Sequence, residues 1–187
     1  MEKITSKSRE VAAVAVFSSL YAALSLATAY IPTGPFFIQF RPAIAIPMIA
    51  AVIFGPWVAG LSAAIGTFVA SIIRYGTAIL TIFSGTPANF LGFYTMGHAY
   101  RLLSKRTKWT LALIVASVAG LFVGSVIIGI GLWFLARTFV PQLALTGFSD
   151  LRYSMYASFL LVYAPAPIAL LIAISVVKLL GPRSISS

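Results

Sequence analysis

The chain has 187 residues, of which 60% are hydrophobic and only 9% carry a charge. A soluble globular domain has about 25% charged residues, so the composition excludes one and indicates an all-α protein that crosses a membrane several times. The formal net charge is +10 and cysteine is absent. Because the basic residues lie in short segments beside apolar spans, they favour a role in membrane topology over nucleic-acid binding. The lack of cysteine excludes disulfides and thiolate metal sites.

The first apolar span follows a basic start and runs without charge over residues 11–40. A signal peptide has an apolar core of about 7–15 residues, so we predict a retained helix over 11–31. Small residues recur at every fourth position of this helix: Ala15, Ser19, Ala23 and Ala27. Such a stripe lets another helix approach closely in lipid. The other helix can belong to a partner or to this protein itself.

The stretch 42–73 has 32 uncharged residues between Arg41 and Arg74. About 20 residues suffice to cross a bilayer core. The stretch is therefore either one long tilted helix or two shorter helices, 38–54 and 56–73, that turn back at Gly55-Pro56. A Gly-Pro pair is a strong turn signal.

The distribution of lysine and arginine decides between these alternatives. With the turn, both termini lie on one side, and that side carries nine basic residues: Lys3, Lys7, Arg9, Arg101, Lys105, Arg106, Lys108, Lys178 and Arg183. The other side carries four: Arg41, Arg74, Arg137 and Arg152. A single long helix would divide them six against seven. Because basic loops stay in the cytoplasm, we predict one membrane domain over 1–187 with six transmembrane helices and both termini cytoplasmic.

The short second helix leaves room for a depression on the outer face, with Arg41 and Arg74 at its rim. From Pro42 to Phe54 this helix has about 13 residues, which at 1.5 Å per residue span only about 20 Å. A cationic side chain at the bilayer centre costs about 2.5–3.5 kcal/mol on insertion scales. Both arginines should therefore reach water, lipid phosphate or an anionic ligand.

The fourth helix is predicted over 87–103, with Thr86 as its N-cap and Pro87 at its first position. Residues 76–85 would then form a folded outer loop. Asn89 falls in the first turn, where free backbone N–H groups favour a polar or anionic group. Its amide either binds a ligand or bonds a neighbouring helix. His98, one turn before Arg101, suits a snorkelling or interhelical role better than catalysis.

The last two helices are predicted over 109–136 and 153–178. Gly120 and Gly124 in the first of them allow close backbone contact with a neighbour. A kink is expected in the second at Pro165 and Pro167. The loop between the two helices contains Asp150, for which an ion pair with a neighbouring arginine is the simplest role.

Several kinds of chemistry lack their usual residues. The sequence has no Gly-x-x-x-x-Gly-Lys-Ser/Thr loop for ATP and no Gly-x-Ser-x-Gly elbow. One histidine and three acids cannot provide a metal cage. No predicted helix has an acid at its middle, which ion-coupled transport normally needs. We therefore predict no enzyme, no metal and no cofactor, but a binding pocket open to the outside in a protein without its own energy source.

Three sequence features resemble the membrane-embedded substrate-binding S-components of energy-coupling factor (ECF) vitamin transporters. Residues 45–60, AIPMIAAVIFGPWVAG, resemble the passage between the second and third helices of that family. Residues 85–92, GTPANFLG, resemble its entry into the fourth helix. The small-residue stripe of the first helix is similar to its Ala-x-x-x-Ala surface, a pattern that Ala23 and Ala27 meet strictly.

The resemblance implies a high-affinity binding subunit of an ABC importer for a water-soluble vitamin or related micronutrient. A transmembrane coupling protein would dock on the stripe, two cytoplasmic ATPases would power the cycle, and the subunit would topple in the membrane to deliver its substrate. By position, the resemblance implies nine pocket residues: Phe36, Phe37, Arg74, Tyr75, Asn89, Trp133, Asp150, Tyr153 and Tyr156. Aromatic faces would stack on a planar ring, and Arg41 or Arg74 would pair with a carboxylate or phosphate. The features associated with biotin, cobalt and nickel are absent, which leaves riboflavin, thiamine or its pyrimidine precursor, folate, pantothenate and a queuosine precursor.

Three other functions remain open at this stage. A stand-alone facilitator or channel would use Arg41 and Arg74 to select a small anionic or aromatic solute. A lipid-modifying enzyme would need Asp150, the one acid predicted on the outer side. A purely structural subunit would bind no small molecule.

Overall fold

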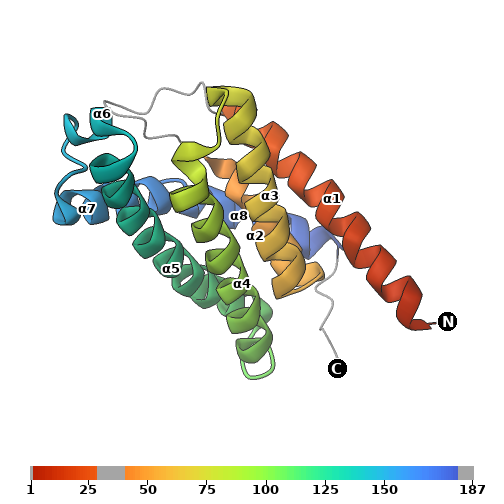
Figure 1. The fold of residues 1–187 in the computed structure, drawn as a ribbon. Coiled ribbons are helices and arrows are strands. Elements are labelled where there is room, and N and C mark those ends of the chain that lie inside the picture. Colours follow the sequence, from red (N-terminus) through yellow and green to blue (C-terminus); the bar gives the residue numbers. More distant parts are fainter. Residues whose placement is uncertain (1, 29–40, 181–187) are drawn as a thin grey trace.

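A computed structural model describes residues 2–28 and 41–180. All regular elements among these residues are helical, as the composition predicts (Figure 1). In chain order they are α1 (Glu2–Thr28), the 3₁₀ helix η1 (Pro42–Ile44), α2 (Ala45–Ile53), α3 (Pro56–Tyr75), the π-helix η2 (Thr81–Gly85), α4 (Thr86–Leu103), α5 (Trp109–Thr138), α6 (Pro141–Ala144), α7 (Leu151–Tyr163) and α8 (Ala166–Leu180).

Four long helices, α1, α3, α4 and α5, lie side by side in that order (Figure 1). The short helix α2 packs against α3, α4 and α8, and α7 packs against α5. Seven of the nine residues of α2 are buried, so α2 forms the centre of the bundle. The end of α3, the start of α4 and the end of α5 lie at the upper side of Figure 1, where α6 also lies.

The break at Gly55-Pro56 is confirmed. Helix α2 ends at Ile53, α3 begins at Pro56, and Gly55 between them has a φ of 95° that favours glycine. With nine residues, α2 is about 14 Å long, shorter than the predicted helix 38–54. Residues 38–40 of that helix lie outside the described part of the chain. The remainder starts with a 3₁₀ turn at Pro42, which has no backbone N–H to donate.

Other helix boundaries differ from the sequence prediction by a few residues or more. Helix α1 begins at Glu2 rather than at residue 11, because the basic segment 2–10 contains good helix formers. Its predicted end at residue 31 lies outside the described residues. Helix α5 begins at residue 109 as predicted and continues to Thr138. The predicted kink in the last helix is confirmed, since Pro165 separates α7 from α8.

Four helical runs are long and apolar enough to cross a membrane: Lys7–Thr28, Pro56–Tyr75, Trp109–Thr138 and Leu151–Leu180. The segment Pro42–Ile53 is apolar but shorter. Helix α4 is not among these runs, because Asn89, His98 and Arg101 lower its hydropathy. The six crossings and the cytoplasmic position of both termini therefore stay predictions.

One end of the bundle gathers basic side chains. The guanidinium of Arg9 lies 5.9 Å from the ring centroid of Phe54. The guanidinium of Arg101 covers Gly55 so closely that a methyl group there would collide with it. Lys105, Arg106 and Lys108 follow directly after α4. The start of α1, the α2–α3 turn and the α4–α5 loop thus share one basic end, opposite the start of α4.

Candidate functional site

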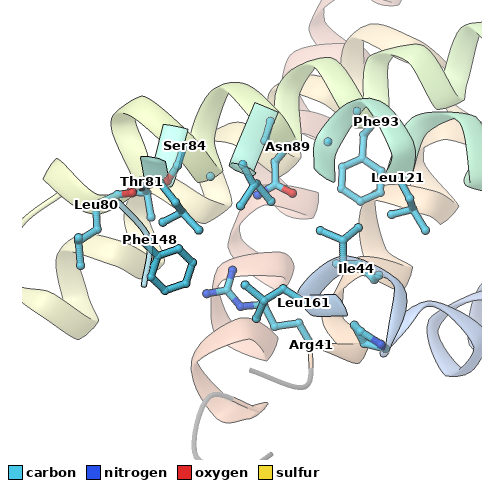
Figure 2. Close-up of a pocket in the computed structure, with 18 of the residues that line it drawn as sticks. Arg41, Ile44, Leu80, Thr81, Ser84, Asn89, Phe93, Leu121, Phe148 and Leu161 are labelled. Atoms are coloured by element: carbon cyan, nitrogen blue, oxygen red, sulfur yellow. Dashed lines mark hydrogen bonds between the residues drawn. The ribbon is translucent and has the colours of Figure 1, made fainter. Parts of the chain in front are cut away.

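A cavity of about 500 Å³ lies between α4 and α5 and is also lined by residues from other elements (Figure 2). Small-molecule sites usually have volumes of about 300–1,000 Å³ and mostly apolar walls, and this cavity has both properties. Its lining residues are Tyr21, Arg41, Ile44, Tyr75, Leu80, Thr81, Ser84, Gly85, Ala88, Asn89, Gly92, Phe93, Met96, Gly120, Leu121, Gly124, Ile128, Leu132, Val140, Gln142, Leu143, Thr146, Phe148, Leu161, Val162 and Pro165.

Glycine positions in α5 determine where the cavity opens. A methyl group on Gly120 would lie 2.5 Å from the carbonyl oxygen of Gly92 and 2.6 Å from Cβ of Met96, so α4 and α5 are in direct contact there. The close glycine contact predicted for this helix is confirmed at Gly120. A methyl group on Gly124 would meet only the carbonyl oxygen of Ala88, at 3.5 Å. One turn further along α5, the packing between the helices is therefore looser, and Gly124 lines the cavity.

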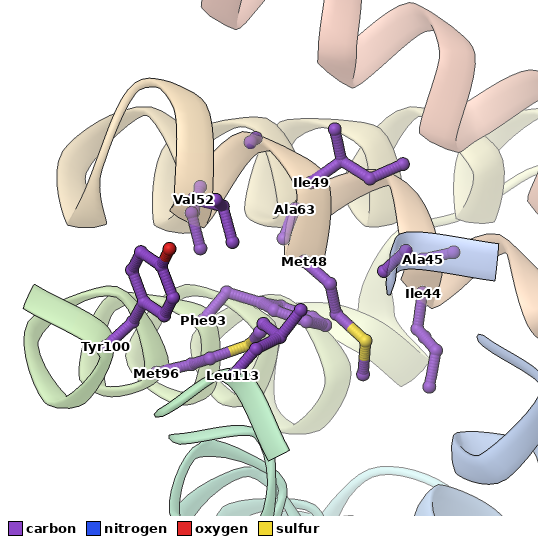
Figure 3. Packing of buried hydrophobic residues seen from close by; sticks show 14 of the residues in the cluster. Ile44, Ala45, Met48, Ile49, Val52, Ala63, Phe93, Met96, Tyr100 and Leu113 are labelled. Carbon is purple, nitrogen blue, oxygen red and sulfur yellow. The ribbon is translucent and has the colours of Figure 1, made fainter. Parts of the chain in front are cut away.

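A sealed core lies beside the cavity (Figure 3). Met48 and Val52 of α2 and Leu113 of α5 have no exposed surface, and Met96 of α4 has almost none. Phe93 packs in the same cluster and also lines the cavity. This core closes the cavity toward the basic end of the bundle.

Asn89 supplies the best-defined polar group of the cavity. Its Nδ2 donates a hydrogen bond of 2.7 Å to Oγ1 of Thr67 on α3. This bond uses one of the two amide hydrogens and fixes the side chain, which leaves the carbonyl oxygen and the second hydrogen for a ligand. The sequence left open a ligand role or a bond to a neighbouring helix, and the structure allows both at once.

The segment before α4 differs from the prediction. Residues 81–85 form the π-helix η2 rather than part of a loop, and the Thr86 backbone N–H donates to the Thr81 carbonyl. The prediction of Thr86 as a side-chain cap is wrong, since its Oγ1 is buried without a hydrogen-bond partner. Asn89 consequently does not lie at a free helix N-terminus. The reason is that the chain enters α4 from a helical turn, which satisfies those N–H groups.

The π-helix η2 contributes Thr81, Ser84 and Gly85 to the cavity wall. The Ser84 hydroxyl donates to the Leu80 carbonyl within this turn. π-helical turns are rare and frequently occur at functional sites. The turn brings polar side chains to the cavity where a regular helix would orient them differently.

Three of the predicted site residues, Arg41, Tyr75 and Asn89, line the cavity together. Figure 2 shows Arg41 and Asn89 on different walls, with Phe148 beside them. Arg74 lines a smaller adjoining pocket. Phe36 and Phe37 lie outside the described residues.

The four remaining predicted site residues do not line the cavity. The guanidinium of Arg137 lies 4.9 Å from the ring of Trp133. The Asp150 side chain accepts a 2.7 Å hydrogen bond from the Arg152 backbone N–H and caps α7, in place of the expected ion pair. Tyr153 packs edge-on against Phe148, and Tyr156 is 66% exposed.

Most of the apolar wall of the cavity is not marked in the sequence. Phe93, Leu121 and Phe148 line the cavity, but nothing distinguishes them in the sequence from other apolar residues of the helices and loops. The signal that was available is the pair Gly120 and Gly124, which predicts a close contact. It does not predict that the contact is looser at Gly124 than at Gly120.

A second pocket of about 20 Å³ adjoins the cavity, and we call it the annex. It shares Arg41, Tyr75 and Thr81 with the cavity. Its other walls are Ser25, Leu26, Thr67, Ala70, Ser71 and Arg74, from α1 and α3. The annex is thus the most polar part of the hollow.

Comparison with known proteins identifies the chain. A model of the ECF-type riboflavin transporter S component family matches residues 5–150, which include α1 through α6. The chain belongs to this family. It is therefore a multi-pass integral membrane protein and the vitamin-type substrate-binding subunit of an ECF transporter, a class of transporter subunits rather than enzymes. No curated protein and no solved structure matches it.

The outward surface of α1 in this S-component carries the predicted stripe. Ala15, Ser19, Ala23 and Ala27 are all exposed. The opposite face of α1 is packed on α3, where Tyr21 lies so close to Gly66 that a methyl group there would be 2.8 Å from its ring. The stripe is therefore not used for packing among the described helices of this chain.

Proposed function

We propose that this S-component binds riboflavin in the cavity between α4 and α5 and delivers it to an ECF importer. The observation that carries the proposal is a cavity of about 500 Å³ with apolar walls and one anchored amide, Asn89, in a chain matched by the riboflavin S-component family. An apolar cavity with a few placed polar groups is the usual form of a site for a flat heterocycle.

The chemistry of the walls suits a flavin ring. Phe93 and Leu121 offer apolar and aromatic surface to the ring faces. Asn89 offers an acceptor and a donor together, which complement the adjacent N–H and C=O groups of the ring's polar edge. Tyr75, Thr81 and Arg41 offer further polar groups to a hydroxylated tail.

The exposed stripe on α1 supports the following proposal for the transport step. A transmembrane coupling protein docks on Ala15, Ser19, Ala23 and Ala27, two cytoplasmic ATPases power the cycle, and the subunit topples in a membrane that it crosses six times with both termini inside. With 9% charged residues, the chain loses little solvation when it tilts. Small side chains permit a close, sliding contact between helices in lipid.

Riboflavin titration of the purified protein in nanodiscs tests the binding step. We expect saturable quenching of flavin fluorescence at one ligand per protein. Asn89→Ala should weaken binding about tenfold or more, because buried polar ring atoms lose their partner, an effect of about 1.4 kcal/mol. Thr138→Ala, at an exposed hydroxyl outside the cavity, serves as the control. Stabilisation by another vitamin but not by riboflavin would contradict the proposal.

The double variant Ala23→Leu/Ala27→Leu tests the docking step. We expect uptake through the complete importer to be lost while riboflavin affinity is retained. The control Val115→Leu/Val118→Leu adds bulk to the exposed face of α5 and should transport normally. Rapid riboflavin flux through this chain alone in liposomes would support a stand-alone facilitator instead.

A further inference from the structure

We propose that Tyr21 of α1 is a ligand-binding residue, whose hydroxyl donates a hydrogen bond to an acceptor atom on the ring of the bound vitamin. This inference rests on the proposed function, since it concerns the same cavity. It is carried by a residue of α1, a helix to which the sequence resemblance assigns only the docking of a partner.

The Tyr21 side chain reaches the cavity from within the packed core. It is only 1% exposed, it belongs to the main hydrophobic cluster, and it lines the cavity. The base of its ring is held by α3, because a methyl group on Gly66 would lie 2.8 Å from its Cδ1. A ring held in this way presents its hydroxyl at a defined place.

The Tyr21 hydroxyl has no hydrogen-bond partner among the described residues. The side-chain polar atoms that are both sealed in protein and unpartnered in this part of the chain belong to Ser25, Thr86, Arg101 and Ser125. The Tyr21 hydroxyl is not sealed, so it reaches open space, and the space that Tyr21 lines is the cavity. If packing were its only role, phenylalanine would fill the same volume without burying a hydroxyl.

The Tyr21 hydroxyl offers a hydrogen that other hydroxyl groups of the cavity wall do not. Those of Thr81, Ser84 and Thr146 each donate to a carbonyl group three or four residues earlier in the chain. These three hydroxyls therefore offer a ligand only an acceptor. The Tyr21 hydroxyl still has its hydrogen to donate, and it complements a carbonyl oxygen or a ring nitrogen.

The contacts of α3 place Tyr21 and Asn89 at the same level of the bundle. Gly66 receives the Tyr21 ring, and the next residue, Thr67, accepts the hydrogen bond from Asn89. Consecutive residues of a helix differ by only about 1.5 Å in height. Because Asn89 is the proposed partner of the ring's polar edge, the Tyr21 hydroxyl meets the ring of the ligand rather than its tail.

Tyr21→Phe tests the hydrogen bond, because it removes the hydroxyl and keeps the aromatic ring. We expect calorimetric titration of the full chain in nanodiscs to show a loss of riboflavin affinity of about fivefold, the usual scale for one neutral hydrogen bond. The melting temperature without ligand should not fall, since no described protein group loses a partner. An affinity within about twofold of that of the unmodified protein would overturn the proposal.

A ligand without a tail locates the contact. Lumiflavin has the flavin ring with a methyl group in place of the hydroxylated tail. Because Tyr21 is assigned to the ring, Tyr21→Phe should weaken the binding of riboflavin and of lumiflavin by the same factor. A loss confined to riboflavin would overturn this assignment, since the partner of Tyr21 would then be a hydroxyl of the tail.

Two other tyrosines provide matched controls. Tyr100 is 3% exposed and does not line the cavity, so Tyr100→Phe removes a buried phenol hydroxyl and should keep the riboflavin affinity. The Tyr163 hydroxyl donates to the Val118 carbonyl at 2.9 Å, also outside the cavity lining. Tyr163→Phe should therefore lower the melting temperature and keep the affinity. If either control weakened riboflavin binding as much as Tyr21→Phe, the assignment would be wrong.

Failure of the proposed function gives a different result. If riboflavin does not bind, that function fails, and Tyr21 is then judged with thiamine and folate, which also contain rings with acceptor atoms. Binding of either vitamin that Tyr21→Phe weakens about fivefold would keep Tyr21 as a ligand-binding residue. Equal affinity of the two proteins, or binding of neither vitamin, would overturn this inference as well.

Discussion

Two glycines one turn apart on α5 have different surroundings: Gly120 lies at a sealed contact with α4, and Gly124 lies beside the open cavity. Toward the basic end, a methyl group on Gly120 would lie 2.5 Å from the carbonyl oxygen of Gly92, so α4 and α5 are in direct contact. Helix α4 is also packed on α3 there, since a methyl group on Gly97 would lie 2.5 Å from Cα of Pro56. One turn further along α5, a methyl group on Gly124 would make only an ordinary contact, 3.5 Å from the Ala88 carbonyl oxygen, and beyond it Gly131 packs closely on Phe83 of the π-helix η2. A glycine in a membrane helix therefore indicates close packing only where a neighbour is present, and otherwise it enlarges a cavity.

Substitution of Gly120 is expected to have the largest effect, and the quantity it lowers is the stability of the fold. Gly120→Val places two methyl groups against the backbone of Gly92 and the side chain of Met96, where one methyl already collides. Overpacking a core costs about 1–3 kcal/mol when side chains can shift, and a backbone neighbour shifts less. We expect a loss of about 3 kcal/mol or more, seen as a large fall in melting temperature. Gly124→Ala is the matched control and should melt at or above the temperature of the unmodified protein, since alanine favours helix by about 1 kcal/mol.

Substitution of Gly124 is expected to have the next largest effect, which is a loss of ligand affinity rather than of stability. Gly124→Leu directs a large side chain into the cavity, where only the Ala88 carbonyl is near. We expect riboflavin affinity to fall about thirtyfold, or about 2 kcal/mol, with little change in melting temperature. Fluorescence titration and thermal unfolding of the same sample measure both. If Gly124→Leu lowered the stability as much as Gly120→Val, the packing around Gly124 would be as tight as the packing around Gly120.

Substitution of Asp150, at the start of α7, tests whether this residue affects stability alone or also ligand affinity. Asp150 caps α7 and does not line the cavity. Asp150→Ala should lower stability by about 1 kcal/mol, and Asp150→Asn should restore most of it because asparagine also caps. A titration in which both variants lose riboflavin affinity without losing stability would instead make Asp150 a binding residue.

Substitution of Thr86, at the start of α4, is expected to have the smallest effect on stability. Unlike Asp150 at the start of α7, Thr86 does not cap its helix. Because the Thr86 hydroxyl is buried without a partner, Thr86→Val should leave stability unchanged or raise it by about 0.5 kcal/mol. A side-chain cap would lose about 1 kcal/mol in the same substitution. Thermal unfolding separates these outcomes.

The fold was more predictable than the cavity. Gly55-Pro56 and Pro165 break their helices as expected, because glycine and proline act through the local backbone. The start of α4 was predicted wrongly, because Thr86 and Pro87 have the sequence of a cap and the π-helix before them is set by packing on α3 and α5. Arg41 and Asn89 could be singled out because only 9% of the residues are charged and Asn89 is the one asparagine, and Tyr75 was named by position from the family resemblance. Phe93 and Phe148 could not be singled out, since apolar residues are everywhere and only tertiary contacts select among them.

The two faces of α1 suggest how substrate release can be controlled, because one face lines the cavity and the other is exposed. Tyr21 is 1% exposed, packs on Gly66 and lines the cavity, while Ser19 and Ala23 on neighbouring positions face outward. An α-helix with its side chains is only about 10–12 Å across. A protein bound to the outside of α1 would thus be one helix diameter from the cavity. A small rotation of α1 would then move Tyr21 in the cavity wall directly, without a change in the rest of the bundle.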